Sequence, residues 1–153
     1  MFLSIKNIPK VSWSSVKPLN LRPKISTFFF LCFGLMLFGL GEGLLIVSIT
    51  GASPWSVLAH GISLNLHFTI GTVSLFISIG VLFFWFFLNQ KPGIGTVLNA
   101  LIIALMIDLC VKFVPTPKIY LFQILLAITA VLTVGLGASI YLVANLGPGP
   151  RDG

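Results

Sequence analysis

The chain has 153 residues, of which 57% are hydrophobic and only 8% are charged, whereas soluble domains carry roughly 25% charged residues. With a mean hydropathy of +1.10 it cannot present a water-compatible surface, which excludes a soluble protein and predicts a membrane protein. The net charge of +6 does not indicate a nucleic-acid partner, because most basic residues precede the first apolar run, as in the cytoplasmic flank of a membrane helix.

Residues 1–25 form a basic tail that we expect to lie at the cytoplasmic surface. Its five basic residues are Lys6, Lys10, Lys17, Arg22 and Lys24. The apolar stretch 26–49 follows and is predicted to be the first membrane span. A signal peptide is the alternative, but its apolar region would be only about 7 to 15 residues long.

A short polar helix is predicted at residues 54–67. Ser53 supplies a side-chain oxygen for free N–H groups, and Pro54 is favoured at a first helical position. The segment is too short to cross a hydrocarbon core, which takes about 20 helical residues. We therefore expect a helix that is either re-entrant or interfacial.

Three more spans are predicted at residues 69–88, 96–114 and 120–146, separated by breaks rich in glycine and proline. The fold class is therefore all-α and polytopic, with a transmembrane domain over residues 26–153. Seven basic residues lie on the side of the N-terminus, including Lys91 and Arg151, and two lie opposite, Lys112 and Lys118. This distribution predicts a multi-pass plasma-membrane protein with a cytoplasmic N-terminus.

The chain contains an internal repeat with an offset of 96 residues. The matched pairs are Gly39/Gly135, Leu40/Leu136, Gly41/Gly137, Val47/Val143, Gly51/Gly147 and Pro54/Pro150. Three spans separate equivalent points, so the second copy is expected to run in the opposite sense, as in the inverted repeats of transporters. This inference requires that residues 54–67 do not cross the membrane. The second copy stops at Gly153, and we expect the chain to be truncated at its C-terminus.

Three motifs resemble those of the YczE/YitT-like family of bacterial integral membrane proteins, in its YczE branch. They are Gly51-Ala-Ser-Pro-Trp-Ser-Val-Leu58, Lys91-Pro-Gly-Ile-Gly-Thr-Val-Leu-Asn99 with Ile107-Asp108 beyond it, and Leu146-Gly-Pro-Gly-Pro-Arg-Asp-Gly153. The resemblance covers the chain from about residue 27 onward and implies neither a substrate nor catalytic residues. Glu42 departs from the apolar residues expected there.

Two acids, Glu42 and Asp108, lie within predicted spans. A charge at the centre of a bilayer costs at least about 2.5 to 3.5 kcal/mol, so such residues usually face a cavity or a partner. Each could couple proton or ion movement. The alternative is a protonated carboxyl, or one that is hydrogen-bonded to a neighbouring helix.

Small residues predict a helix contact. Gly39 and Gly43 match Gly135 and Ser139 in the second copy, and such pairs let membrane helices approach closely. We expect the first and fourth spans to cross at these four residues.

Each glycine–proline break, at Ser53-Pro54 and at Pro150-Arg151-Asp152, is expected to begin a helix whose N-terminus could attract an anion. Alternatively, Arg151 anchors the inner interface and pairs with Asp152. His60 and His67 are expected on the polar face of the short helix, and no pattern of catalytic, metal-binding or cofactor-binding residues is present.

The prediction for function is a transporter-like membrane protein, not an enzyme, that binds or moves a small solute, an anionic one included. The alternative is a non-transporting scaffold or regulatory protein. The expected partners are the lipid bilayer, a small solute and a further copy of the chain in a homo-oligomer; no metal or cofactor is expected.

Overall fold

The computed structural model describes residues 11–16, 19–20 and 22–151, and all the regular structure in these ranges is helical, as the sequence predicts. Four long apolar helices have the length and composition of membrane spans, and a short helix lies between the first two. The helices are α1 (Ile25–Ser48), α2 (Pro54–Leu66), α3 (Ile70–Phe87), α4 (Ile94–Phe113) and α5 (Tyr120–Ala144).

Local chemistry sets the helix ends. The Ser53 hydroxyl accepts a hydrogen bond from the Ser56 N–H (3.4 Å) and Pro54 occupies the first turn of α2, which is the predicted start. Thr69 caps α3 in the same way through the Thr72 N–H (3.2 Å). A side-chain oxygen at this position satisfies an N–H group that has no partner within the helix.

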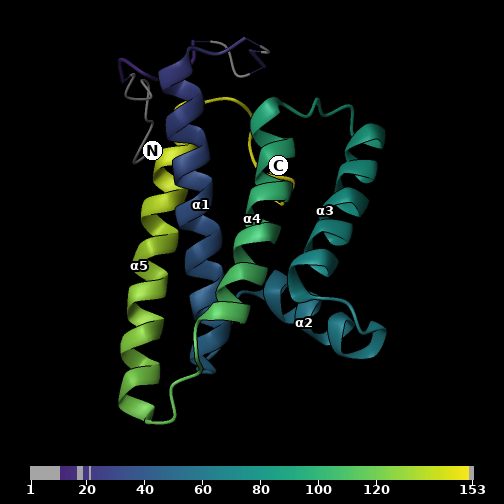
Figure 1. The fold of residues 1–153 in the computed structure, drawn as a ribbon. Coiled ribbons are helices and arrows are strands. Elements are labelled where there is room, and N and C mark those ends of the chain that lie inside the picture. The colour runs from purple at the N-terminus through teal and green to yellow at the C-terminus, as the bar shows by residue number, and fades with distance from the viewer. Residues whose placement is uncertain (1–10, 17–18, 21, 152–153) are drawn as a thin grey trace, which may run out of the picture.

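The four long helices stand in a row in the order α5, α1, α4, α3, with α2 lying across the lower end beside α3 (Figure 1). The chain descends in α1, ascends in α3, descends in α4 and ascends in α5. Since α1 ends and α3 begins at the same end of the row, α2 does not connect opposite ends. Helices α1 and α5 therefore run in opposite directions.

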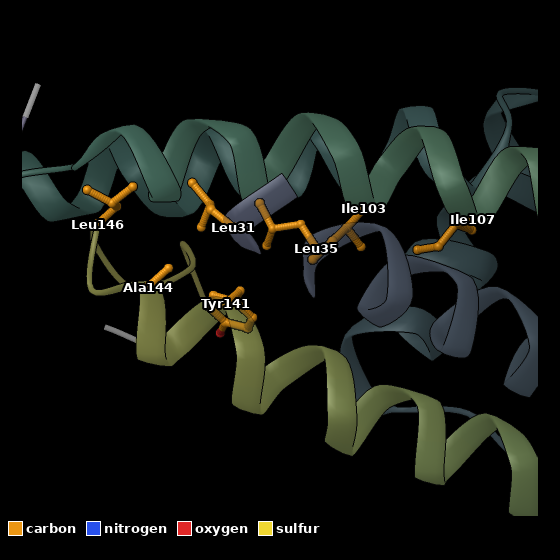
Figure 2. Packing of buried hydrophobic residues seen from close by; sticks show 7 residues of the cluster. All are labelled: Leu31, Leu35, Ile103, Ile107, Tyr141, Ala144 and Leu146. Atoms are coloured by element: carbon orange, nitrogen blue, oxygen red, sulfur yellow. The ribbon is translucent and has the colours of Figure 1, made fainter. Parts of the chain in front are cut away.

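The buried core lies where α1, α4, α5 and the segment after α5 meet. Figure 2 shows the side chains of this cluster pointing toward one another: Leu31, Leu35, Ile103, Ile107, Tyr141, Ala144 and Leu146. The N-terminal segment closes the upper end of the core, because the Ser15 N–H donates to the Ala144 carbonyl (3.1 Å). Trp13 packs against the cluster and stacks on Phe30.

Helices α1 and α5 approach closely at two glycines. A Cβ atom on Gly41 would lie 2.8 Å from both the Ala130 carbonyl oxygen and the Val134 nitrogen. A Cβ atom on Gly137 would lie 2.4 Å from the Phe38 nitrogen and 2.7 Å from the Gly34 carbonyl oxygen. Both glycines thus let two backbones touch, as small residues do in membrane interfaces.

The predicted contact of Gly39 and Gly43 with Gly135 and Ser139 is wrong. Added Cβ atoms on Gly39 and Gly43 would meet α4, at Met106 and Cys110, whereas Gly135 has open space and Ser139 is exposed. Successive residues in a helix are about 100° apart, so Gly41 lies nearly opposite Gly39. The face of α1 that carries Gly39 and Gly43 is a helix contact, as predicted from its small residues, but the helix that packs against it is α4 and not α5.

Candidate functional site

Glu42 is held inside the protein by the start of α2. Its side chain is 7% exposed, and its Oε2 atom accepts hydrogen bonds from the hydroxyls of Ser53 (2.9 Å) and Ser56 (2.6 Å). Within the described residues, Oε1 of the same carboxyl receives no hydrogen bond. The helix start thus positions the acid and leaves one oxygen able to accept from a ligand.

A cavity of about 110 Å³ adjoins this carboxyl, and we call it the central cavity. Its polar lining comes from Glu42, Ser53, Asn99 and Arg151, and its apolar lining from Phe38, Trp55 and Ile103. These residues belong to α1, α2, α4 and the segment after α5. The cavity therefore joins residues from the two sequence segments that match at an offset of 96 residues.

Asn99 is the unusual polar group of the cavity. It is 8% exposed, and in the part of the chain that the structure describes its side-chain amide forms no hydrogen bond. No fully buried side-chain nitrogen or oxygen in the described ranges lacks a partner, so the atoms of this amide are accessible, and they border the cavity. A donor and an acceptor are thus available to a molecule in the central cavity.

Arg151 reaches the cavity because the segment after α5 turns back into the helix row (Figure 1). The Gly95 N–H donates to the Leu146 carbonyl (2.9 Å), and the Thr96 hydroxyl donates to the Pro148 carbonyl (2.7 Å). Two motifs of the sequence, at the start of α4 and after α5, are therefore in direct contact.

The Arg151 guanidinium lies among polar groups of α3. It donates to the Ser74 hydroxyl, to the Ser74 carbonyl (3.3 Å) and to the Ser78 hydroxyl (3.3 Å). Its Cζ atom is 5.8 Å from the centre of the Trp55 ring, within the range of a cation–π contact. Arg151 therefore lies deep in the row and does not lie at its upper end as an interface anchor would.

The predicted pairing of Arg151 with Asp152 lies outside the described residues. Pro150 is fully buried and forms a turn with Arg151 where the description ends. The predicted helix start at Pro54 is present, and its cap Ser53 lines the cavity.

Asp108 is used differently from Glu42, because both of its oxygens bind the start of α3. Oδ1 accepts from the Gly71 N–H (2.7 Å) and Oδ2 from the Thr69 hydroxyl (2.6 Å). A carboxyl at a helix N-terminus is favoured by the free N–H groups and the helix dipole. Asp108 thus ties α4 to α3, which matches the alternative of a hydrogen-bonded packing residue.

A separate open groove lies beside Asp108 and includes His60. Across the described ranges, no group of three or more His, Cys, Asp and Glu side chains could hold a metal ion.

Sequence reasoning missed Asn99, Ser74, Ser78 and the contribution of Trp55. A signal was present for the serines, because Ser74 and Ser78 are four residues apart and share one face of a largely apolar helix. Nothing local identified Asn99, whose role depends on residues distant in the chain.

The comparisons with known proteins agree with this architecture. Residues 25–153 match a family described as "Family of unknown function (DUF6198)". The chain is 35% identical over 149 residues to an uncharacterized protein of Haemophilus influenzae, covering 97% of this chain and 67% of that one.

Two similar proteins come from Bacillus subtilis. Uncharacterized membrane protein YczE is 31% identical, with 82% of this chain and 59% of YczE covered. Uncharacterized protein YyaS is 32% identical, with 78% and 61% covered. The chain thus spans about three fifths to two thirds of the length of these relatives.

No solved structure matches the chain. The family match covers all five helices, and the four apolar helices agree with the membrane relative. The chain therefore belongs to the DUF6198 family and is a membrane protein homologous to YczE.

Proposed function

We propose that the protein is transporter-like and binds a small solute in the central cavity, between two halves of an inverted repeat. One observation carries the proposal: Asn99 is more than nine-tenths buried, lines the cavity and has no hydrogen-bond partner among the described residues. A solute in the cavity could pair with this amide, which can both donate and accept a hydrogen bond.

The contacts between α1 and α5 support the inverted repeat. Gly41 meets Ala130 and Val134, and an offset of 96 residues relates this contact to the one that Gly137 makes with Gly34 and Phe38. Such reciprocity, in which each side supplies the same surface, is typical of a twofold axis. The two helices also run in opposite directions (Figure 1).

The ends of α1 and α5 share their backbone geometry. Ile49 and Asn145 are equivalent in the repeat and both are left-handed, with φ of 57° and 54°. Gly51 and Gly147 follow, each with positive φ. Since His67 at the end of α2 is left-handed as well, the packing of α1 against α5 is the stronger support for the twofold relation.

Trp55 and Arg151 are also equivalent positions, and they contact each other beside the cavity. Equivalent residues meet only near a twofold axis, so the cavity would lie at the interface of the repeats. Transporters with inverted repeats hold their substrates in this position.

We further propose that the N-terminus is cytoplasmic in the plasma membrane. Arg22 and Lys24 precede α1 and Lys91 lies between α3 and α4, at the end of the row where α1 begins. Lys112 lies in the last turn of α4 and Lys118 lies between α4 and α5, at the opposite end. Arg151 lies inside the row and is not counted, but the end of the row where α1 begins still has more basic residues than the opposite end.

Thermal stabilisation of the purified chain in lipid nanodiscs, measured against a panel of small solutes, tests the proposal. A bound solute raises the midpoint by mass action. Asn99→Leu should abolish the shift by filling the cavity and removing the amide, whereas Asn65→Leu, at an exposed position of α2, should retain it.

A shift that survives Asn99→Leu would place binding elsewhere. The absence of a shift with every solute would contradict solute binding and favour the scaffold alternative.

A further inference from the structure

We infer that the central cavity binds a small zwitterion, a molecule that carries an ammonium and an acidic group a few bonds apart. The inference rests on the proposed function and specifies the chemical class of its solute.

The charges of the lining disfavour ligands that carry only one kind of charge. Glu42 and Arg151 both line one cavity of about 110 Å³. A ligand with only negative charge would meet the Glu42 carboxyl, and one with only positive charge would meet the Arg151 guanidinium. In a buried site such like-charge contacts are costly, because the low effective dielectric strengthens them. A molecule with both charges has a favourable partner on each side.

The hydrogen-bonding groups of the lining suit a zwitterion whose ammonium faces Glu42 and whose acidic group faces Arg151. The free Oε1 atom of Glu42 accepts from an ammonium, while Ser53 and Ser56 hold Oε2 of the same carboxyl. Arg151 donates to the acidic group, held in place by Ser74 and Ser78. The Asn99 amide can donate to the acidic group or accept from the ammonium. Each polar lining group then has a role.

The size of the cavity limits the ligand to a few heavy atoms. For comparison, an apolar protein cavity of roughly 150 Å³ admits benzene. Phe38 and Ile103 leave an apolar wall beside the charged groups, which suits a short methylene segment between the two ends. Glycine and β-alanine have this composition, with two different charge separations.

Binding of glycine and β-alanine to the full chain in nanodiscs, compared with acetate and methylammonium, tests the inference. We expect a zwitterion to bind at least ten-fold more tightly than either singly charged probe. Glu42→Gln should weaken zwitterion binding at least ten-fold and let acetate bind as well as glycine. Arg151→Gln should show the opposite selectivity, favouring methylammonium. Asp108→Asn, an acid-to-amide change outside the cavity, should leave the preference unchanged.

Tight binding of acetate or methylammonium to the unaltered chain would overturn the zwitterion class while leaving solute binding intact. Binding of a zwitterion that is unaffected by Glu42→Gln would also overturn it. If none of the four probes binds while another solute shows an Asn99-dependent shift, the zwitterion class fails and the proposed function stands.

A lipid headgroup with an ammonium and a phosphate has the same chemistry. Nanodiscs of phosphatidylglycerol alone are therefore compared with nanodiscs that contain phosphatidylethanolamine. Stabilisation by free glycine in both lipids would support a soluble zwitterion. Stabilisation that requires phosphatidylethanolamine and disappears in Glu42→Gln would support a headgroup as the source.

Discussion

The two matched segments, 39–55 and 135–151, end their helices in a similar way but have different neighbours. In both, the helix ends in a left-handed residue, a glycine of positive φ lies two residues later, and a proline lies three residues after that glycine. In the first copy α4 covers Gly39, whereas the equivalent Gly135 faces open space.

This difference shows which structural features the matched residues determine and which they do not. Glycines and the proline at matching positions determine how each helix ends and how closely α1 and α5 approach. Which neighbour covers the remaining face depends on the rest of the chain. Substitutions at equivalent positions of the two segments can therefore test the shared contacts and the unshared neighbours separately.

The largest effects are expected at the reciprocal glycines. Gly41→Ala and Gly137→Ala should each lower the free energy of unfolding by about 1 to 3 kcal/mol, because the added Cβ atom overlaps backbone atoms of the opposite helix. Unfolding in mixed micelles with increasing denaturing detergent measures the change.

Gly80→Ala is the matched control, because nothing lies within 4 Å of its Cβ position. A loss at only one of the two reciprocal glycines would break the twofold relation.

A smaller and unequal effect is expected at Gly39 and Gly135. Gly39→Ala should destabilise by about 1 to 2 kcal/mol, because its Cβ atom would lie 2.9 Å from the Ile103 Cα atom of α4. Gly135→Ala meets nothing and should be neutral, or stabilise by up to about 1 kcal/mol through helix propensity. The same unfolding assay compares them, and equal losses would show that α5 has a neighbour on this face.

Changes in stability of opposite sign are expected for substitutions at the left-handed residues that end α1 and α5. Ile49→Asn should stabilise by about 1 kcal/mol, because asparagine tolerates left-handed backbone better than a β-branched residue. Asn145→Ile should destabilise by at least as much, since it also removes the hydrogen bond to the Ser15 carbonyl (2.9 Å). Changes of the same sign in the unfolding assay would contradict an equivalent geometry.

The smallest effect on stability is expected for Glu42→Gln, at the position where the second copy has Ala138. The amide oxygen can still accept from Ser53 and Ser56, so unfolding should change by less than about 1 kcal/mol. Circular dichroism during detergent unfolding checks this. A loss of several kcal/mol would mean that the Glu42 carboxyl is chiefly structural.

The helices were predictable because their signals are local. Apolar runs of sufficient length, the Ser53-Pro54 start and the glycine breaks each act within a few residues. The matches at an offset of 96 residues were visible for the same reason. The partner of each glycine was not predictable, because α1 has small residues on two opposite faces, at Gly39 and at Gly41.

The candidate site was only partly predictable. Glu42, Ser53 and Arg151 were identified as unusual within apolar or glycine-rich stretches. Arg151 reaches Asn99 and the other lining residues because the segment after α5 returns into the helix row, where it contacts α4. Such contacts join residues about fifty positions apart and leave no local pattern.

The contact between the start of α4 and the segment after α5 limits how the two motifs can vary among related proteins. A Cβ atom on Gly93 would lie 2.3 Å from the Leu146 carbonyl oxygen, and one on Gly95 would lie 2.8 Å from that of Gly147. A side chain at either glycine would push the returning segment away and withdraw Arg151 from the cavity. The two motifs therefore constrain each other, and a chimaera that exchanges one between relatives should tolerate the exchange best when the other accompanies it.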